Sequence, residues 1–182
     1  DTHDDGVENR EAKDGREIVT LDINGFKKLN DTYGHALGHK ILGEVGSHLV
    51  GTIKDIMISD EEEDYEYDGS NAFRTGGDEF SILSSPDDTQ TIEERVVCEF
   101  GKGKEGVLTT TKRGETLVLE MSNGSVVLDN GQEVGYIQYS GKYGDVRISL
   151  AAGHGENTED ADFAMYEMKQ LVKRKEEELA SN

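Results

Sequence analysis

The sequence predicts an α+β domain in which an antiparallel, ferredoxin-like sheet carries helices on its faces. Strand and helix segments are expected in the order β-α-β-β-α-(β)-β-α, which is typical of such sheets. Gly-Gly and Asn-Gly pairs between neighbouring apolar runs indicate tight antiparallel hairpins. With 182 residues the chain is long enough for one domain with a substantial core, so residues 1–182 are interpreted as a single domain.

The first part of the chain is expected to supply a strand, a loop and a long helix. Residues 17–23 form a β-type apolar run and predict the first strand. Residues 30–38 are expected to form a loop with a short helical turn. Apolar residues then recur every four positions, which predicts one buried face of a helix of about five turns. That face consists of Leu37, Ile41, Val45, Leu49 and Ile53.

Two adjacent glycines, Gly76 and Gly77, separate two short apolar runs and predict a β-hairpin. Asp78 and Glu79 follow the turn directly. Paired carboxylates on a tight turn could hold a hard cation such as Mg²⁺, which takes oxygen ligands and keeps phosphates as partners. Taken alone, the motif also fits an exposed hairpin tip whose acids are solvated.

The second part of the chain is expected to be rich in strands. An acidic run at residues 59–69 precedes the hairpin and is typical of a solvated loop, and residues 91–100 predict a short helix. A β-hairpin meander is predicted as an insertion from about residue 106 to 140, and it fits either a decorated sheet edge or an interaction surface. Its turn signals are Lys112-Arg113-Gly114, Ser122-Asn123-Gly124 and Asp129-Asn130-Gly131. Residues 146–153 predict a central strand, and residues 159–179 predict the last helix.

Composition excludes several classes of partner. The formal net charge of −20 argues against binding to nucleic acid or anionic lipid, since both need clustered Lys and Arg. No apolar run is long enough to span a membrane, and no secretory signal pattern is visible. The single Cys98 cannot form an internal disulfide, which fits a cytoplasmic location. Because the chain begins at Asp1 rather than Met, we expect an upstream sensory or regulatory domain in the parent protein.

Three motifs follow one another along the chain. The first places Asp22 at a strand end, followed by Phe26-Lys27, Asn30-Asp31 and Gly34-His35; the second is Gly76-Gly77-Asp78-Glu79-Phe80; the third is Ala161-Asp162-Phe163-Ala164-Met165-Tyr166 with Lys169. In this order and spacing they resemble the GGDEF family, the diguanylate cyclases of bacterial signal transduction. The resemblance covers roughly residues 6–175, beginning at a Gly6-Val7-Glu8-Asn9-Arg10 turn.

The resemblance implies a palm-type sheet and an enzyme that condenses two GTP molecules into cyclic di-GMP and pyrophosphate. It implies that Asp22, Asp78 and Glu79 are catalytic and, with the carbonyl of Ile23, hold two Mg²⁺ (or Mn²⁺) ions per active site. Each protomer would bind one GTP, so turnover would need a homodimer. The positions implied to bind substrate are Phe26, Lys27, Asn30, His39, Arg74, Gly76, Gly77, Lys169 and Lys173.

Some positions depart from the family pattern. The family reads guanine with an Asn and an Asp, and the Asp position here is His39. A carboxylate accepts two hydrogen bonds from guanine, whereas a neutral imidazole offers one acceptor and one donor, so guanine preference is expected to weaken about ten- to a hundred-fold. Tyr67 and Ser70 replace the Arg and Asp of the family's product-inhibition site, so no such inhibition is expected. The first helix of the family is shortened here.

Three hypotheses follow from this sequence. The first is an active cyclase that makes cyclic di-GMP. The second is a cyclase of the same fold with altered base choice, motivated by His39. The third is a degenerate domain that binds nucleotide, or acts in dimerisation or signalling, without turnover; the shortened first helix and the inserted strands motivate it.

Overall fold

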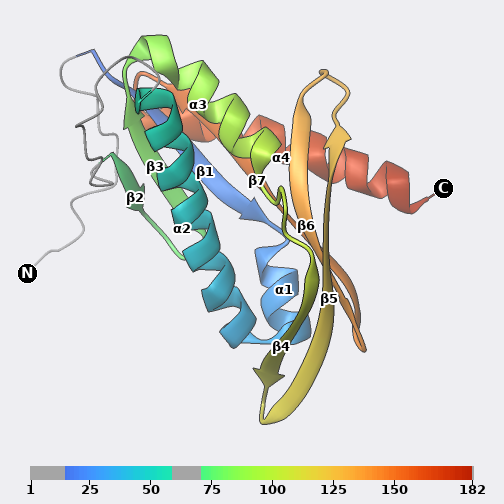
Figure 1. Ribbon diagram of the computed structural model, residues 1–182. Coiled ribbons are helices and arrows are strands. Elements are labelled where there is room, and N and C mark those ends of the chain that lie inside the picture. Colours follow the sequence, from blue (N-terminus) through green and yellow to red (C-terminus); the bar gives the residue numbers. More distant parts are fainter. Residues whose placement is uncertain (1–14, 59–70, 182) are drawn as a thin grey trace, which may run out of the picture.

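The computed structural model describes residues 15–58 and 71–181 (Figure 1). The predicted turn at residues 6–10, the predicted acidic loop at 59–69, and Tyr67 and Ser70 lie outside the described residues. The elements are β1 (Glu17–Asn24), α1 (Phe26–Tyr33), α2 (His35–Ile58), β2 (Ala72–Arg74), β3 (Glu79–Ser84), α3 (Pro86–Glu99), β4 (Gly106–Lys112), β5 (Glu115–Val127), β6 (Glu133–Gly141), β7 (Gly144–Gly155) and α4 (Thr158–Ala180).

The strands form one sheet in the order β2-β3-β1-β7-β6-β5-β4, and every neighbouring pair is antiparallel. β1 lies between β3 and β7, which brings the end of β1 next to the start of β3: Asp22 is opposite Glu79. The predicted α+β class with an antiparallel sheet is therefore confirmed. The segment predicted to be an insertion, about residues 106–140, forms β4, β5 and most of β6, and it extends the sheet at the edge remote from β2.

Helices cover both faces of the sheet, as Figure 1 shows for α3 and α4. Successive residues of a strand point to opposite faces. In β7, Gly153 lies against α4, because a Cβ there would be 2.1 Å from the Met165 nitrogen. The next residue, His154, contacts Glu93 of α3. Thus α4 packs on one face, and α3 packs on the other beside α2.

The core confirms the helical period read from the sequence. Five residues spaced four apart on α2 are all buried: Leu37, Ile41, Val45, Leu49 and Ile53. They pack with the inward residues of β1, of which Val19 and Leu21 are fully buried. The driving force is the removal of this continuous apolar face from water. None of the helices in the two described ranges is both long and apolar enough to cross a membrane.

The loop predicted at residues 30–38 is wrong, because this segment is mostly helical. α1 continues to Tyr33, and α2 begins at His35 after the single residue Gly34, whose φ is 91°. The polar residues of this segment are weak helix formers. However, Leu29 and Tyr33 lie four residues apart on α1 and are both fully buried, so tertiary packing overrides local propensity.

The turn predicted at Asn123-Gly124 is also wrong, because β5 runs straight through it. Gly124 is opposite Tyr136 of β6, and a Cβ at Gly124 would lie 2.5 Å from the Tyr136 hydroxyl. The glycine therefore makes room for a neighbouring ring instead of turning the chain. The turns predicted at Arg113-Gly114 and Asn130-Gly131 are confirmed, and they join β4 to β5 and β5 to β6.

The helix predicted at residues 91–100 begins earlier, at Pro86. Proline suits the first position of a helix because its missing N–H would have no helical partner there. The Thr89 hydroxyl donates a hydrogen bond to the Ser85 carbonyl at 2.8 Å and reinforces this start.

Candidate active site

The Gly-Gly hairpin is held by its own backbone and by Arg74. The Arg74 guanidinium donates hydrogen bonds to the carbonyl oxygens of Gly76 (3.1 Å) and Gly77 (2.8 Å). The turn is also tied to β1, since the Ile23 N–H donates to the Asp78 carbonyl at 3.3 Å. Arg74 therefore stabilises the turn through hydrogen bonds on the solvent-exposed side of the hairpin. The tie to Ile23 places Asp78 beside the end of β1.

Two carboxylates, those of Asp22 and Asp78, lie together where β1 and β3 meet, and Glu79 is opposite Asp22. Asp22 is buried, with only 6% of its surface exposed. Burial, followed by a hydrogen bond with Asp22 and the charge of that group, raises the pKa of Asp78 to about 6. Burial and the negative charges of Asp22 and Asp162 raise the pKa of Glu79. The site thus consists of the pair Asp22 and Asp78, whose negative charge also acts on Glu79. Such a site favours a bound cation.

Helix α4 supplies that positive charge in the form of Lys169. Its Nζ donates a hydrogen bond to Asp22 Oδ2 at 2.5 Å, while Asp22 Oδ1 accepts from the Ile23 N–H at 2.8 Å. The Lys169 side chain is 35% exposed, so one side of the ammonium group remains accessible to solvent. Lys173 lies one turn further along α4 and is exposed. Both lysines predicted to bind phosphate therefore point to the same region.

A cavity of about 330 Å³ lies between the start of α1 and α4. Among the sequence-predicted site residues it is lined by Ile23, Phe26, Lys27, Asp78, Lys169 and Lys173. Gly25 precedes α1 with a φ of 83°, and a Cβ at this position would lie 2.3 Å from the Arg147 carbonyl, so only glycine fits. The cavity combines cationic side chains with the positive end of a helix, which suits a polyphosphate.

The donor set fits a hard divalent cation. Asp22 and Asp78 offer carboxylate oxygens, and the raised pKa of Asp78 reflects a like charge that a cation would offset. Across residues 15–58 and 71–181, no group of three or more His, Cys, Asp or Glu side chains is arranged to hold a metal ion. A cation here would therefore complete its coordination with substrate oxygens and water, as Mg²⁺ commonly does.

A family profile described as "Diguanylate cyclase, GGDEF domain" matches residues 7–138, more than half of the chain. The chain belongs to the GGDEF domain family. Most of the segment predicted to be an insertion, up to residue 138, falls within the matched segment, whereas the α4 motif that carries Lys169 lies beyond it.

Curated relatives of this GGDEF domain include characterised and uncharacterised proteins. It is 38% identical over 66 residues to the diguanylate cyclase DgcS of Shewanella oneidensis, covering 36% of this chain and 18% of the relative. It is 29% identical over 115 residues to the diguanylate cyclase DosC of Escherichia coli, covering 62% and 21%. The match to the uncharacterised protein YhcK of Bacillus subtilis is 29% over 140 residues, covering 77% and 28%. The chain thus matches only a minor part of each relative's length.

Among solved structures, an EAL/GGDEF domain protein from M. capsulatus superposes with a TM-score of 0.46 and 16% identity, covering 88% of this chain and 83% of the other. A diguanylate cyclase/phosphodiesterase from Caldicellulosiruptor saccharolyticus gives a TM-score of 0.34 and 19% identity, covering 90% and 71%.

The cavity of about 330 Å³ beside Asp78 is called the phosphate-type cavity below, and the two positions predicted to read the base do not line it and lie in different surroundings. Asn30, on α1, lines a separate cavity of about 530 Å³. Its Oδ1 is buried and, among the described residues, has no hydrogen-bond partner. Gly38 allows this placement, since a Cβ there would lie 1.9 Å from that oxygen. His39 is exposed on α2 and lines neither of these two cavities.

Sequence reasoning missed several residues that line the phosphate-type cavity, among them Lys28, Gln170 and Glu176. Lys28 follows Lys27, and Glu176 lies seven residues after Lys169 on α4, so helical spacing could have identified both. Glu176 is partly buried near Arg147 and Lys28, and burial raises the pKa of its carboxyl group.

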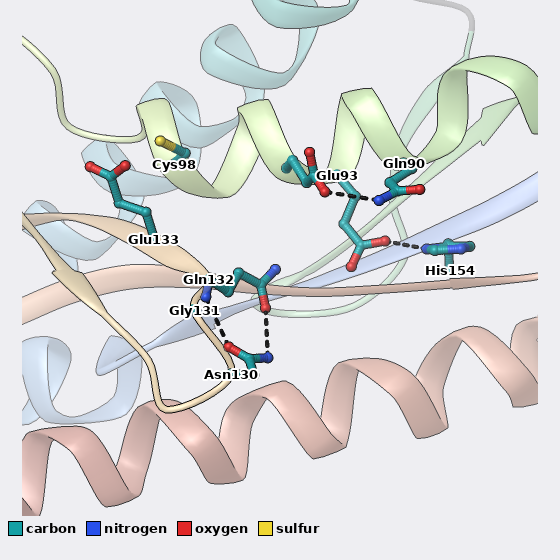
Figure 2. A pocket seen from close by; sticks show the side chains of 9 residues that line it. Gln90, Glu93, Cys98, Asn130, Gly131, Gln132, Glu133 and His154 are labelled. Atoms are coloured by element: carbon teal, nitrogen blue, oxygen red, sulfur yellow. Dashed lines mark hydrogen bonds and ion pairs between the residues drawn. The ribbon is translucent and has the colours of Figure 1, made fainter.

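A larger cavity of about 670 Å³ lies between α3 and the β5–β6 turn (Figure 2). The His154 imidazole contacts the Glu93 carboxylate across it. Burial, followed by a hydrogen bond to Glu133, raises the pKa of the Cys98 thiol, so Cys98 is a poor nucleophile at neutral pH. None of the site residues predicted from the sequence lines this cavity.

Proposed function

We propose that this GGDEF domain is a diguanylate cyclase, which condenses two GTP molecules into cyclic di-GMP and pyrophosphate. The observation that carries the proposal is the convergence of Asp22 and Asp78 beside a cavity lined by Lys27, Lys169 and Lys173. In a chain with a net charge of −20, a cavity lined by lysines next to the buried Asp22 and the half-buried Asp78 suits a nucleotide polyphosphate bound with a metal.

Each side chain has a role that follows from its position. Asp22 and Asp78, with Glu79 and the Ile23 carbonyl, would hold two Mg²⁺ ions, which when bound activate the attacking hydroxyl and stabilise the leaving pyrophosphate. Lys27, Lys169 and Lys173 hold the β- and γ-phosphates. The backbone N–H groups at the start of α1, near Phe26, add donors to the same phosphates.

Lys169 changes partner in this proposal. In the structure Lys169 pairs with Asp22 at 2.5 Å and neutralises a buried carboxylate. A triphosphate in the cavity offers a stronger partner of higher charge, so Lys169 turns toward it and Asp22 becomes free to bind the metal. Substrate and metal then bind cooperatively through this one side chain.

Turnover requires two copies of the domain, because each contributes one GTP to the product. The parent protein would then bring two copies together through segments outside this chain or through the domain itself. Cytoplasmic signalling is the setting that fits this substrate.

A second candidate function, a cyclase with altered base choice, is motivated by His39. His39 is exposed and does not line the cavity that contains Asn30, and because it stands at the family's Asp position the usual carboxylate acceptors are missing from this site. For that reason the guanine N–H donors would lose two acceptors in the protein, and the preference for GTP over ATP would weaken.

One experiment separates the active cyclase from its alternatives. Purified protein is incubated with Mg²⁺ and GTP, ATP or both, and the products are resolved by chromatography. We expect cyclic di-GMP and pyrophosphate from GTP, and a loss of at least about a hundred-fold in Asp22→Asn, which keeps the shape but removes a ligand charge.

Asp129→Asn, an exposed acid on the β5–β6 turn, is the matched control and should keep wild-type activity. Wild-type rates in Asp22→Asn with an unchanged melting temperature would show that the site is wrongly assigned. A mixed or adenine-containing product would favour the second candidate.

A further inference from the structure

The tip of the β4–β5 hairpin is fixed against the corner between α1 and α2. Lys112 Nζ donates hydrogen bonds to the carbonyl oxygens of Asp31 (2.7 Å) and Thr32 (2.9 Å). These carbonyls lie in the last turn of α1, where backbone acceptors lack helical partners. Gly34 permits the approach, because a Cβ there would lie 3.2 Å from the Lys112 Cβ. The inserted hairpin is therefore held in a defined position beside Asn30.

The 530 Å³ cavity that contains Asn30 opens between these two elements. Its volume is in the range of small-molecule sites. The unpaired, buried Oδ1 of Asn30 is a polar group that the described part of the protein leaves unsatisfied, as ligand-binding amides often are before the ligand arrives. The lining consists of Asn30, Asp31, Gly34, His35, Ala36, Thr111, Lys112 and Arg113.

Arg113 occupies an unfavourable backbone position at this cavity. Its φ is 48°, and it is the one non-glycine residue with a positive φ among those described. Gly114 follows with a φ of 80°, and a two-residue turn of this kind favours Asn, Asp or Gly in the first position. Within the described ranges, the Arg113 guanidinium makes no hydrogen bond or ion pair. Arg113 is exposed and lines this cavity, so its guanidinium is available to a ligand there, and its strained backbone is compatible with a functional position.

The two cavities can be occupied by one nucleotide. Phe26 and Lys27, at the start of α1, line the phosphate-type cavity, and Asn30, on the last turn, lines the second one. Helix α1 has eight residues and is about 12 Å long, which is comparable to the distance from a nucleotide's phosphates to its base. A nucleotide lying along α1 with its phosphates at Lys27 would therefore place its base beside Asn30 and Arg113.

We propose that Arg113, supplied by the inserted hairpin, reads the O6 and N7 atoms of guanine and sets the base preference of this domain. A guanidinium offers only donors. Guanine presents two acceptors on this edge, whereas adenine presents one acceptor and an amino donor. Arg113 would thus distinguish guanine from adenine at the O6/N7 edge of the base. This would replace the discrimination at the other edge of the base that His39 does not supply. The inference rests on the proposed function, since it assumes that a nucleotide binds along α1.

The test measures binding rather than turnover. Dideoxy-GTP, dideoxy-ATP and 7-deaza-dideoxy-GTP lack the attacking hydroxyl, and the third also lacks N7. We expect the wild type to bind dideoxy-GTP about ten-fold or more tightly than dideoxy-ATP, with the 7-deaza form in between. In Arg113→Ala and Arg113→Gly, the three affinities should become equal within about two-fold, with that for dideoxy-ATP unchanged.

Two variants serve as controls. Arg113→Gly suits the positive φ, so it separates loss of the guanidinium from damage to the turn, and melting temperatures check both variants. Arg174→Ala removes the same charge from an exposed position on α4 outside both cavities, and it should keep the guanine preference.

The outcomes separate this inference from the proposed function. An undiminished guanine preference in Arg113→Ala would overturn the role of Arg113 alone. An equal loss of affinity for dideoxy-GTP and dideoxy-ATP would also overturn it, since Arg113 would then act only through its charge. Failure of the wild type to bind any of the three nucleotides would overturn the proposed function together with this inference.

Discussion

At the scale of single residues, the candidate site holds like charges close together, which is electrostatically unfavourable. Asp22 and Asp78 are like charges held together at partly buried positions, and Lys169 offsets only one of them. Such an arrangement destabilises the free protein and gains stability when a cation or a phosphate binds. If the site binds a ligand, these residues are therefore expected to lower the stability of the protein without that ligand.

The effect of this repulsion on folding stability depends on pH, and the direction of that dependence can be measured. The pKa of Asp78 is raised from 3.8 to about 6, so the folded state holds this proton more tightly than the unfolded state. Stability therefore falls as pH rises through this window, and the loss is complete above the folded pKa. Asp78→Asn should melt above the wild type at about pH 7.5 in EDTA, and this gain should vanish below about pH 4.

Thermal unfolding followed by circular dichroism across this pH range checks the prediction. Asp129→Asn, the exposed control, should show no such pH-dependent gain. If Asp78→Asn melted below the wild type at neutral pH, the carboxylates would not repel one another as the geometry indicates.

At the scale of elements, α4 places Lys169 by packing directly on β7. The contact is made backbone to backbone, since a Cβ at Gly153 would lie 2.1 Å from the Met165 nitrogen and 2.5 Å from the Ala161 carbonyl oxygen. Met168 fills the neighbouring space, and its sulfur accepts a hydrogen bond from the Ala152 N–H at 3.2 Å. The position of the lysine thus depends on a glycine that does not itself line the phosphate-type cavity.

Gly153→Ala should therefore force α4 away from the sheet. We expect a loss of about 1–3 kcal/mol or more in the free energy of unfolding, because the clash involves backbone atoms that cannot rotate away. GTP affinity should fall as well, since Lys169 moves with the helix. Urea unfolding and nucleotide titration measure the two effects.

Gly43→Ala provides the matched control for this change. Gly43 is exposed on α2, and a Cβ there would meet nothing within 4 Å. The same substitution should stabilise the protein by about 0.5–1 kcal/mol through helix propensity. A Gly153→Ala variant as stable as Gly43→Ala would contradict the close packing of α4 on β7.

At the scale of the whole molecule, the net charge of −20 acts against self-association. Two copies must nevertheless meet for the proposed reaction, because one product contains two substrates. Activity at saturating GTP should therefore depend on how often loaded copies encounter each other.

We expect specific activity to rise with protein concentration over about a hundred-fold range, and to rise with salt at a fixed low concentration as long-range repulsion is screened. Initial rates of pyrophosphate release measure this, with sedimentation velocity reporting the fraction of dimer. Specific activity that is the same at every dilution and every salt concentration would show that encounter between copies does not limit turnover.

The sequence by itself determined most helices and strands and the kinds of side chain that lie at their ends. The spacing of Leu37 and its partners predicted α2, the Gly76-Gly77 pair predicted the hairpin, and the acids beside them predicted a cation site. The first two signals work because helical period and turn conformation are properties of short segments, whereas the cation site stays a prediction. Where packing competed with local propensity, as at residues 30–38 and at Asn123-Gly124, the prediction from sequence failed.

Only the tertiary structure decided which residues share a site. Lys169 and Asp22 are 147 positions apart, and Lys112 and Asp31 are 81 apart, so no local pattern encodes either contact. The order of strands in the sheet brings the first pair together, and the docking of the β4–β5 hairpin brings the second. The raised pKa of Asp78 arises in the same way, because burial and a neighbouring charge exist only after the chain has folded.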